Sequence, residues 1–71
     1  MKVYYILIED MYVQAITISN TGFGFIPTWD EEDAGIFEID KCNAFKNAIN
    51  EKAPVLKIEF KEYIKEENEN V

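Results

Sequence analysis

The spacing of apolar and polar residues in the first third of the chain predicts an antiparallel hairpin. Val3 to Ile8 is apolar without alternation, which is typical of a strand that is covered on both faces. Tyr12 to Ser19 alternates, so one predicted face carries Gln14, Ile16 and Ile18 and the other carries Val13, Ala15 and Thr17. We expect the turn Glu9 to Met11 to join these two strands, with the first strand at the centre of a sheet.

Turn and cap signals divide the middle of the chain. Asn20-Thr21-Gly22 predicts a turn before a short third strand, Phe23 to Ile26, which Pro27 closes. Because proline lacks an amide hydrogen, and because Gly24 indicates a bulge or a close backbone approach, we expect this strand at an edge. Thr28 and Glu31 have the spacing of a capping box, which predicts one helical turn from Trp29 to Ala34.

The pattern after Gly35 predicts a strand, a longer helix and a final strand. Ile36 to Ile39 is extended in pattern, and Asp40 is a suitable N-cap for a helix from Lys41 to Lys52. Spacings of three and four residues place one set on a common helix face, namely Cys42, Phe45, Ala48, Ile49 and Lys52. Pro54 ends the helix, and alternation at Leu56, Ile58 and Phe60 predicts the last strand.

These elements predict an α+β fold: an antiparallel sheet of four or five strands with one helix packed on a face, plus one short helical turn. We expect a single domain over residues 1–64 and a disordered acidic tail over residues 65–71. In the core, Phe45, Ala48 and Ile49 are expected to meet a set of sheet residues that includes Tyr5, Leu7, Ile58 and Phe60.

The charge inventory excludes several classes of function. The 71 residues include 14 acidic residues and 7 lysines, with no arginine and no histidine, for a net charge of −7. A strongly negative chain repels nucleic-acid backbones and anionic lipid, so we expect neither direct nucleic-acid binding nor membrane binding. The apolar stretch Val3 to Ile8 is too short for a signal peptide or a membrane span, and Cys42 is a single thiol, so we expect a cytoplasmic location.

Candidate catalytic and metal-binding residues have simpler explanations. Asp30, Glu31, Glu32 and Asp33 offer oxygen ligands for a cation, but four consecutive carboxylates also favour the start of a helix, where the dipole is positive. Ser19 and Cys42 have no histidine to act as a base. We therefore expect no metal, no cofactor and no enzymatic activity.

The strongest candidate for a function is an aromatic segment beside the acidic cluster. Phe23, Phe25 and Trp29 could complete the core, yet adjacent strand residues point to opposite faces, so we expect at least one of the three to be exposed. Exposed aromatic residues with a charged rim are typical of protein interfaces. The predicted partner-binding residues are Phe23, Phe25, Trp29, Asp30, Glu31, Glu32 and Asp33. The acidity could also imitate a nucleic-acid backbone, or serve solubility alone.

The pattern Thr28-x-Asp30-x-x-x-Ala34-x-x-Phe37, followed by the helix Asp40 to Lys52 and an alternating strand, resembles small uncharacterised proteins of phages and prophages of Gram-positive bacteria. The likeness spans residues 3–60 and includes a tyrosine-rich hairpin, but it transfers no site residue. Such proteins are often host-takeover or anti-defence factors, including inhibitors of CRISPR effectors, restriction systems and nucleotide signalling.

We therefore expect a non-catalytic binding protein that inhibits or modulates a host protein, including one that acts on nucleic acid. The alternative is a homodimer or higher homo-oligomer formed by edge-strand pairing, with a small ligand between subunits.

Overall fold

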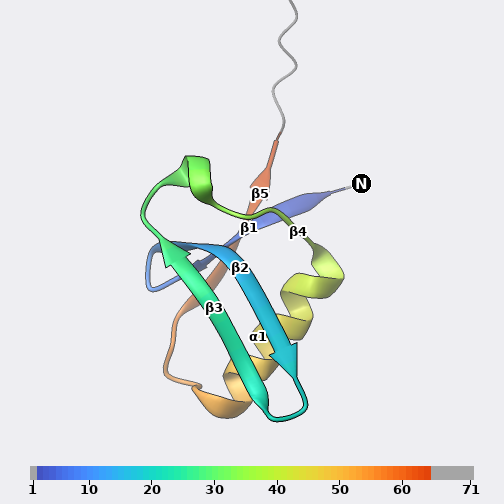
Figure 1. Ribbon diagram of the computed structural model, residues 1–71. Coiled ribbons are helices and arrows are strands. Elements are labelled where there is room, and N and C mark those ends of the chain that lie inside the picture. Colours follow the sequence, from blue (N-terminus) through green and yellow to red (C-terminus); the bar gives the residue numbers. More distant parts are fainter. Residues whose placement is uncertain (1, 65–71) are drawn as a thin grey trace, which may run out of the picture.

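Strand β1 (Val3–Ile8) lies at the centre of a five-stranded antiparallel sheet in the computed structural model, which describes residues 2–64 (Figure 1). Strand β5 (Ile58–Tyr63) pairs with the whole length of β1 along one edge. The other edge is shared, because β2 (Met11–Ser19) pairs with the end of β1 and β4 (Phe37–Glu38) pairs with its beginning. Strand β3 (Gly22–Thr28) pairs with β2 as the outer strand. The predicted α+β class, element order and edge position of β3 are confirmed.

The turn between β1 and β2 consists of Glu9 and Asp10, both with positive φ (49° and 71°). Two successive positive φ values give a turn whose twist matches that of the flanking strands. The turn also holds the start of β5, since the amide of Glu9 donates to the Lys57 carbonyl (3.0 Å) and the Lys57 amide donates to Glu9 Oε2 (2.7 Å). Met11, predicted as part of the turn, is the first residue of β2.

A bulge at Gln14 turns β2 away from β1. Gln14 has no partner between the pairs Val13↔Pro27 and Ala15↔Ile26. One extra residue reverses the side to which later residues point, so Val13 and Ile16 both pack in the core. The prediction that Val13 lies on the face opposite Ile16 is therefore wrong, because it assumed unbroken alternation, whereas Ile16 and Ile18 share a face as predicted. Pro27, expected to close β3, lies within it.

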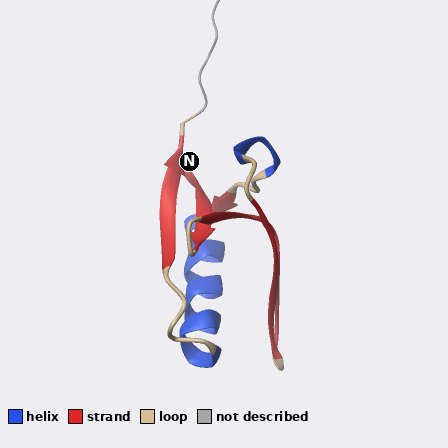
Figure 2. Ribbon diagram, turned by 90° about the vertical axis from the view of Figure 1, so that its left-hand side faces the viewer, coloured by secondary structure: helices blue, strands red, loops and turns tan. Residues whose placement is uncertain are grey.

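Helix α1 (Ile39–Lys52) lies between the β1–β5 strands and the β2–β3 hairpin (Figure 2). It begins two residues earlier than predicted, with Glu38 as N-cap and no side-chain cap hydrogen bond, so Asp40 lies in the first turn and is not the cap. The helix ends before Pro54 as predicted, where the Ala53 amide donates to the Ile49 carbonyl.

The core lies between the helix and the bent sheet. Its fully or almost fully buried side chains are Ile6, Ile8, Val13, Cys42, Phe45 and Ile49. Ile58 and Phe60 pair with Ile8 and Ile6 and pack against this core, as predicted. Tyr5 and Leu7 were predicted to join them, but alternation along β1 places both on the opposite face of the sheet.

Tyrosines cover the face of β1 opposite the helix. The Tyr5 ring makes edge-to-face contacts with Tyr12 and Tyr63, at centroid distances of 5.3 and 5.4 Å. Tyr5 is thereby buried, and Val3 and Leu7 on the same face are half-buried, so this second face of the first strand is covered at Tyr5. Among residues 2–64, no helix is long and apolar enough to cross a membrane. The predicted tail, residues 65–71, lies outside the described residues.

Candidate partner-binding site

The structure separates the aromatic residues that the sequence grouped into one site. Phe23 and Phe25 lie on the helix side of β3 with stacked rings, and each meets the ring of Phe45 edge to face at a centroid distance of 5.9 Å. Phe45 is fully buried, so these contacts belong to the core. For Phe23 and Phe25 the core explanation fits the geometry, and both side chains are half-buried.

Trp29 is the exposed aromatic residue of the segment. It directly follows β3, and 72% of its surface is accessible to solvent. The chain bends here because the Thr28 hydroxyl accepts a hydrogen bond from the Asp30 amide at 3.1 Å. This bond serves a turn rather than the predicted capping box. The expectation that at least one of the three aromatic residues is exposed is confirmed by Trp29.

The acidic cluster forms a shorter helical element than predicted. Glu31–Asp33 is a 3-10 turn, with Asp30 as its N-cap and no side-chain cap hydrogen bond. The Asp33 amide donates to the Asp30 carbonyl (3.0 Å), and the Ala34 amide donates to the Glu31 carbonyl (3.1 Å). All four acidic residues from 30 to 33 are exposed. Within residues 2–64, no group of three or more acidic, cysteine or histidine side chains is arranged to hold a metal ion.

A backbone hydrogen bond holds the end of the acidic turn against the sheet. The Gly35 amide donates to the Val13 carbonyl at 3.0 Å, at the bulge of β2. A Cβ atom at Gly35 would lie 2.4 Å from the Gln14 carbonyl oxygen, so only glycine permits this approach. At the other end, Glu31 lies near Tyr5, and burial together with this carboxylate raises the pKa of the Tyr5 hydroxyl. The turn is therefore held at a defined position beside Trp29.

The two candidate nucleophiles, Cys42 and Ser19, both form hydrogen bonds with residues close to them in the chain. The Cys42 thiol is buried and donates to the Phe37 carbonyl at 3.7 Å, and burial raises its pKa. A raised pKa disfavours the thiolate that a nucleophilic cysteine requires. The Ser19 hydroxyl lies 3.2 Å from the Thr21 hydroxyl and 3.4 Å from the Gly22 carbonyl, within the β2–β3 turn.

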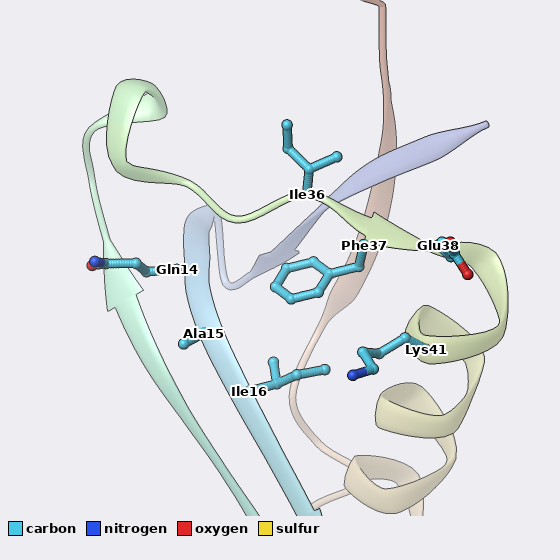
Figure 3. Close-up of a pocket in the computed structure, with 7 residues that line it drawn as sticks. All are labelled: Gln14, Ala15, Ile16, Ile36, Phe37, Glu38 and Lys41. Carbon is cyan, nitrogen blue, oxygen red and sulfur yellow. The ribbon is translucent and has the colours of Figure 1, made fainter. Parts of the chain in front are cut away.

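A groove between β2 and β4 was missed by sequence reasoning (Figure 3). It has a volume of about 570 Å³ and is lined by Gln14, Ala15, Ile16, Ile36, Phe37, Glu38 and Lys41. It exists because β2 leaves β1 at the bulge. The signal in the sequence is the spacing of Val13 and Ile16, since two core residues three positions apart in a strand indicate an extra residue between them.

No protein-family model matches this sequence, and neither a curated protein nor a solved structure was found to resemble it.

Proposed function

We propose that this chain is a non-catalytic protein that binds a partner protein through Trp29 and the acidic turn 30–33. The observation that carries the proposal is the 72% exposure of Trp29 beside four exposed carboxylates. Burying a tryptophan against a partner removes a large apolar area from water, and tryptophans are enriched among the residues that dominate binding energy. Because the Gly35–Val13 hydrogen bond holds the end of the turn against β2, the site has little conformational entropy to lose on binding.

The negative charge of the site indicates which kind of partner surface would complement it. An apolar recess for the indole, bordered by lysine or arginine, complements Trp29 and residues 30–33. Enzymes that act on nucleic acid have basic surfaces of this kind, so a host nuclease or similar enzyme is the partner class we favour. Occupying its basic groove would inhibit it, in keeping with the resemblance to phage and prophage proteins.

Affinity capture with single-residue variants tests the proposal. The chain is immobilised, host proteins that it retains are identified, and each is purified and its Kd measured. We expect Trp29→Ala to weaken binding by at least about tenfold, in the range found for dominant interface residues. Val55→Ala is the control, because Val55 is also an exposed apolar residue (88%) but lies outside the site. Failure to recover a partner, or equal binding by both variants, would contradict the proposal.

Charge variants test the acidic part of the site separately. Asp30→Asn, Glu32→Gln and Asp33→Asn together remove three charges and leave Glu31 against Tyr5. The control variant removes three charges elsewhere, through Asp10→Asn, Glu51→Gln and Glu62→Gln. We expect the first variant to associate more slowly and with a weaker dependence on salt, since complementary charge acts mainly on the association rate. Equal association rates for the two variants would show that total charge, and not this turn, attracts the partner.

A second candidate function is self-association through β3. Within residues 2–64, β3 pairs only with β2, so its outer edge presents free backbone groups. Such an edge can pair with a copy of itself across a twofold axis. Sedimentation velocity at increasing concentration tests this, and a monomer at all concentrations would eliminate it.

A further inference from the structure

Strand β2 has a free edge on the side opposite β3. Beyond Val13 it no longer pairs with β1, and β4 takes the place of β2 beside β1. The Val13 carbonyl is still occupied by the Gly35 amide. From residue 14 to residue 19, no described strand pairs with this edge, which leaves its outward amides and carbonyls available for another strand.

Residues along this strand and residues of helix α1 line two hollows in common. We define the β2–α1 seam by residues 14–19 of the strand and residues 41–52 of the helix. One end is the 570 Å³ groove at Lys41, and the other is a hollow of about 320 Å³ lined by Ser19, Asn20, Gly22, Ala48, Glu51 and Lys52. Five strand steps span about 17 Å and eleven helix steps about 16 Å, so the two sides match in length.

The side chains at the Lys41 end offer an apolar contact and two charged groups of opposite sign, Lys41 and Glu38. Ile16, Phe37 and Lys41 point toward one another across the groove, whereas Ile36 points away (Figure 3). Within the described residues, the ion pairs are Lys2 with Glu62 and Lys57 with Glu59, so neither Lys41 nor Lys52 has a carboxylate partner. Each end of the seam therefore has an ammonium group outside these ion pairs, and the same linings include one carboxylate each, Glu38 at the Lys41 end and Glu51 at the Lys52 end.

We propose that the β2–α1 seam binds an extended peptide segment of a partner protein, which adds to β2 as a further strand. Backbone hydrogen bonds to residues 14–19 hold the segment, an apolar side chain enters between Ile16 and Phe37, and a carboxylate of the segment meets Lys41. A helical segment of a partner could not form these hydrogen bonds with β2, because its backbone amides and carbonyls are already paired within the helix. A second copy of this chain in the seam is disfavoured because each copy carries a net charge of −7. This site is separate from Trp29 and does not depend on the function proposed above.

A peptide display experiment with the full chain tests the proposal. Random heptapeptides are displayed in two forms, one with a free C-terminus and one followed by a polar extension, and enriched sequences are synthesised. We expect an enriched peptide to slow amide hydrogen exchange in the ¹⁵N-labelled chain at those of residues 15–19 whose amides point away from β3. We also expect Lys41→Glu to raise its Kd at least about tenfold. The control is Lys61→Glu, which makes the same charge change at an exposed lysine on β5. If Lys41→Glu does not fold, Lys41→Gln replaces it.

The two display forms identify the source of the carboxylate. Enrichment only with a free C-terminus assigns it to the terminal carboxylate, and enrichment in both forms with a shared acidic position assigns it to a side chain. Three results would overturn the proposal: no peptide is enriched in either form, the bound peptide leaves exchange in β2 unchanged, or Lys41→Glu and Lys61→Glu bind alike. Protection of β2 that rises with protein concentration in the absence of peptide would assign the seam to a second copy instead.

Discussion

At the scale of single residues, Gly35 is the position with the least tolerance for change. Adding a Cβ there places an atom 2.4 Å from the Gln14 carbonyl oxygen and 2.7 Å from the Phe37 ring. We predict that Gly35→Ala lowers the free energy of unfolding by about 1–3 kcal/mol, the cost typical of overpacking, as measured by urea denaturation. Gly22→Ala is the control, because no atom lies within 4 Å of its added Cβ. Equal effects at the two glycines would show that the acidic turn does not approach β2 this closely.

Tyr5 gives a residue-scale prediction about pH. Burial and the Glu31 carboxylate raise its pKa in the folded state, so above about pH 10, the ordinary pKa of tyrosine, the unfolded state loses the proton first. The contribution of Tyr5 to stability is complete below that pH and is lost as pH rises through the folded-state pKa. Urea denaturation between pH 8 and pH 11.5 should show a smaller alkaline loss for Tyr5→Phe than for the unmodified chain. Identical pH profiles would show that folding does not raise the pKa of Tyr5.

At the scale of elements, the β2–β3 hairpin depends on helix α1. Beyond the bulge the hairpin is a two-stranded ribbon, which is marginal in water without further packing. Its packing centres on Phe45, whose ring meets both Phe23 and Phe25.

We therefore predict that Phe45→Leu destabilises the hairpin before the rest of the sheet. Leucine keeps most of the apolar volume but loses both edge-to-face contacts, at a cost of roughly 1–3 kcal/mol. Native-state hydrogen exchange should accelerate first in β2 and β3 and least in β1 and β5. A uniform acceleration across all strands would mean that the hairpin and the sheet open as one unit.

The elements also show what the sequence determines and what it leaves open. Local signals are sufficient for the order of elements along the chain, the edge position of β3 and the end of α1 before Pro54, but not for the spatial order of the strands, in which β5 lies beside β1. They do not determine which face of β1 meets the helix, because a strand covered on both sides has no alternation to read. Strands β2 and β4 pair with different parts of the same edge of β1. The bulge at Gln14 and the start of α1 at Ile39 depend on where the first pairing ends and the second begins, and tertiary packing determines that point.

Only part of the candidate site could be predicted from the sequence. An exposed aromatic residue was expected because adjacent strand residues point to opposite faces, but Phe23 and Phe25 share one face of β3, and Trp29 is exposed because it lies beyond the end of the strand. Which residue is exposed depends on the partner of Phe23 and Phe25, and that partner, Phe45, lies 20 or more residues away in α1. The β2–α1 seam depends on the bulge and was therefore missed with it.

At the scale of the whole molecule, the structure gives an acidic chain two surfaces of different chemistry. One is Trp29 with the acidic turn, which suits a basic partner, and the other is the seam with Lys41 and Lys52, which suits an extended segment. They are formed by different elements, so variants at one should leave binding at the other unchanged. This independence separates the two proposals in any partner that is recovered.

The central claim is that Trp29 is an anchor for a partner protein. Since the chain contains one tryptophan, labelling with 5-fluorotryptophan gives a fluorine NMR spectrum that reports on Trp29 alone. Titrating the labelled chain with a partner recovered by affinity capture should shift and broaden this resonance in proportion to the fraction bound. A resonance that keeps the position and width of the free chain at saturating partner would contradict the claim.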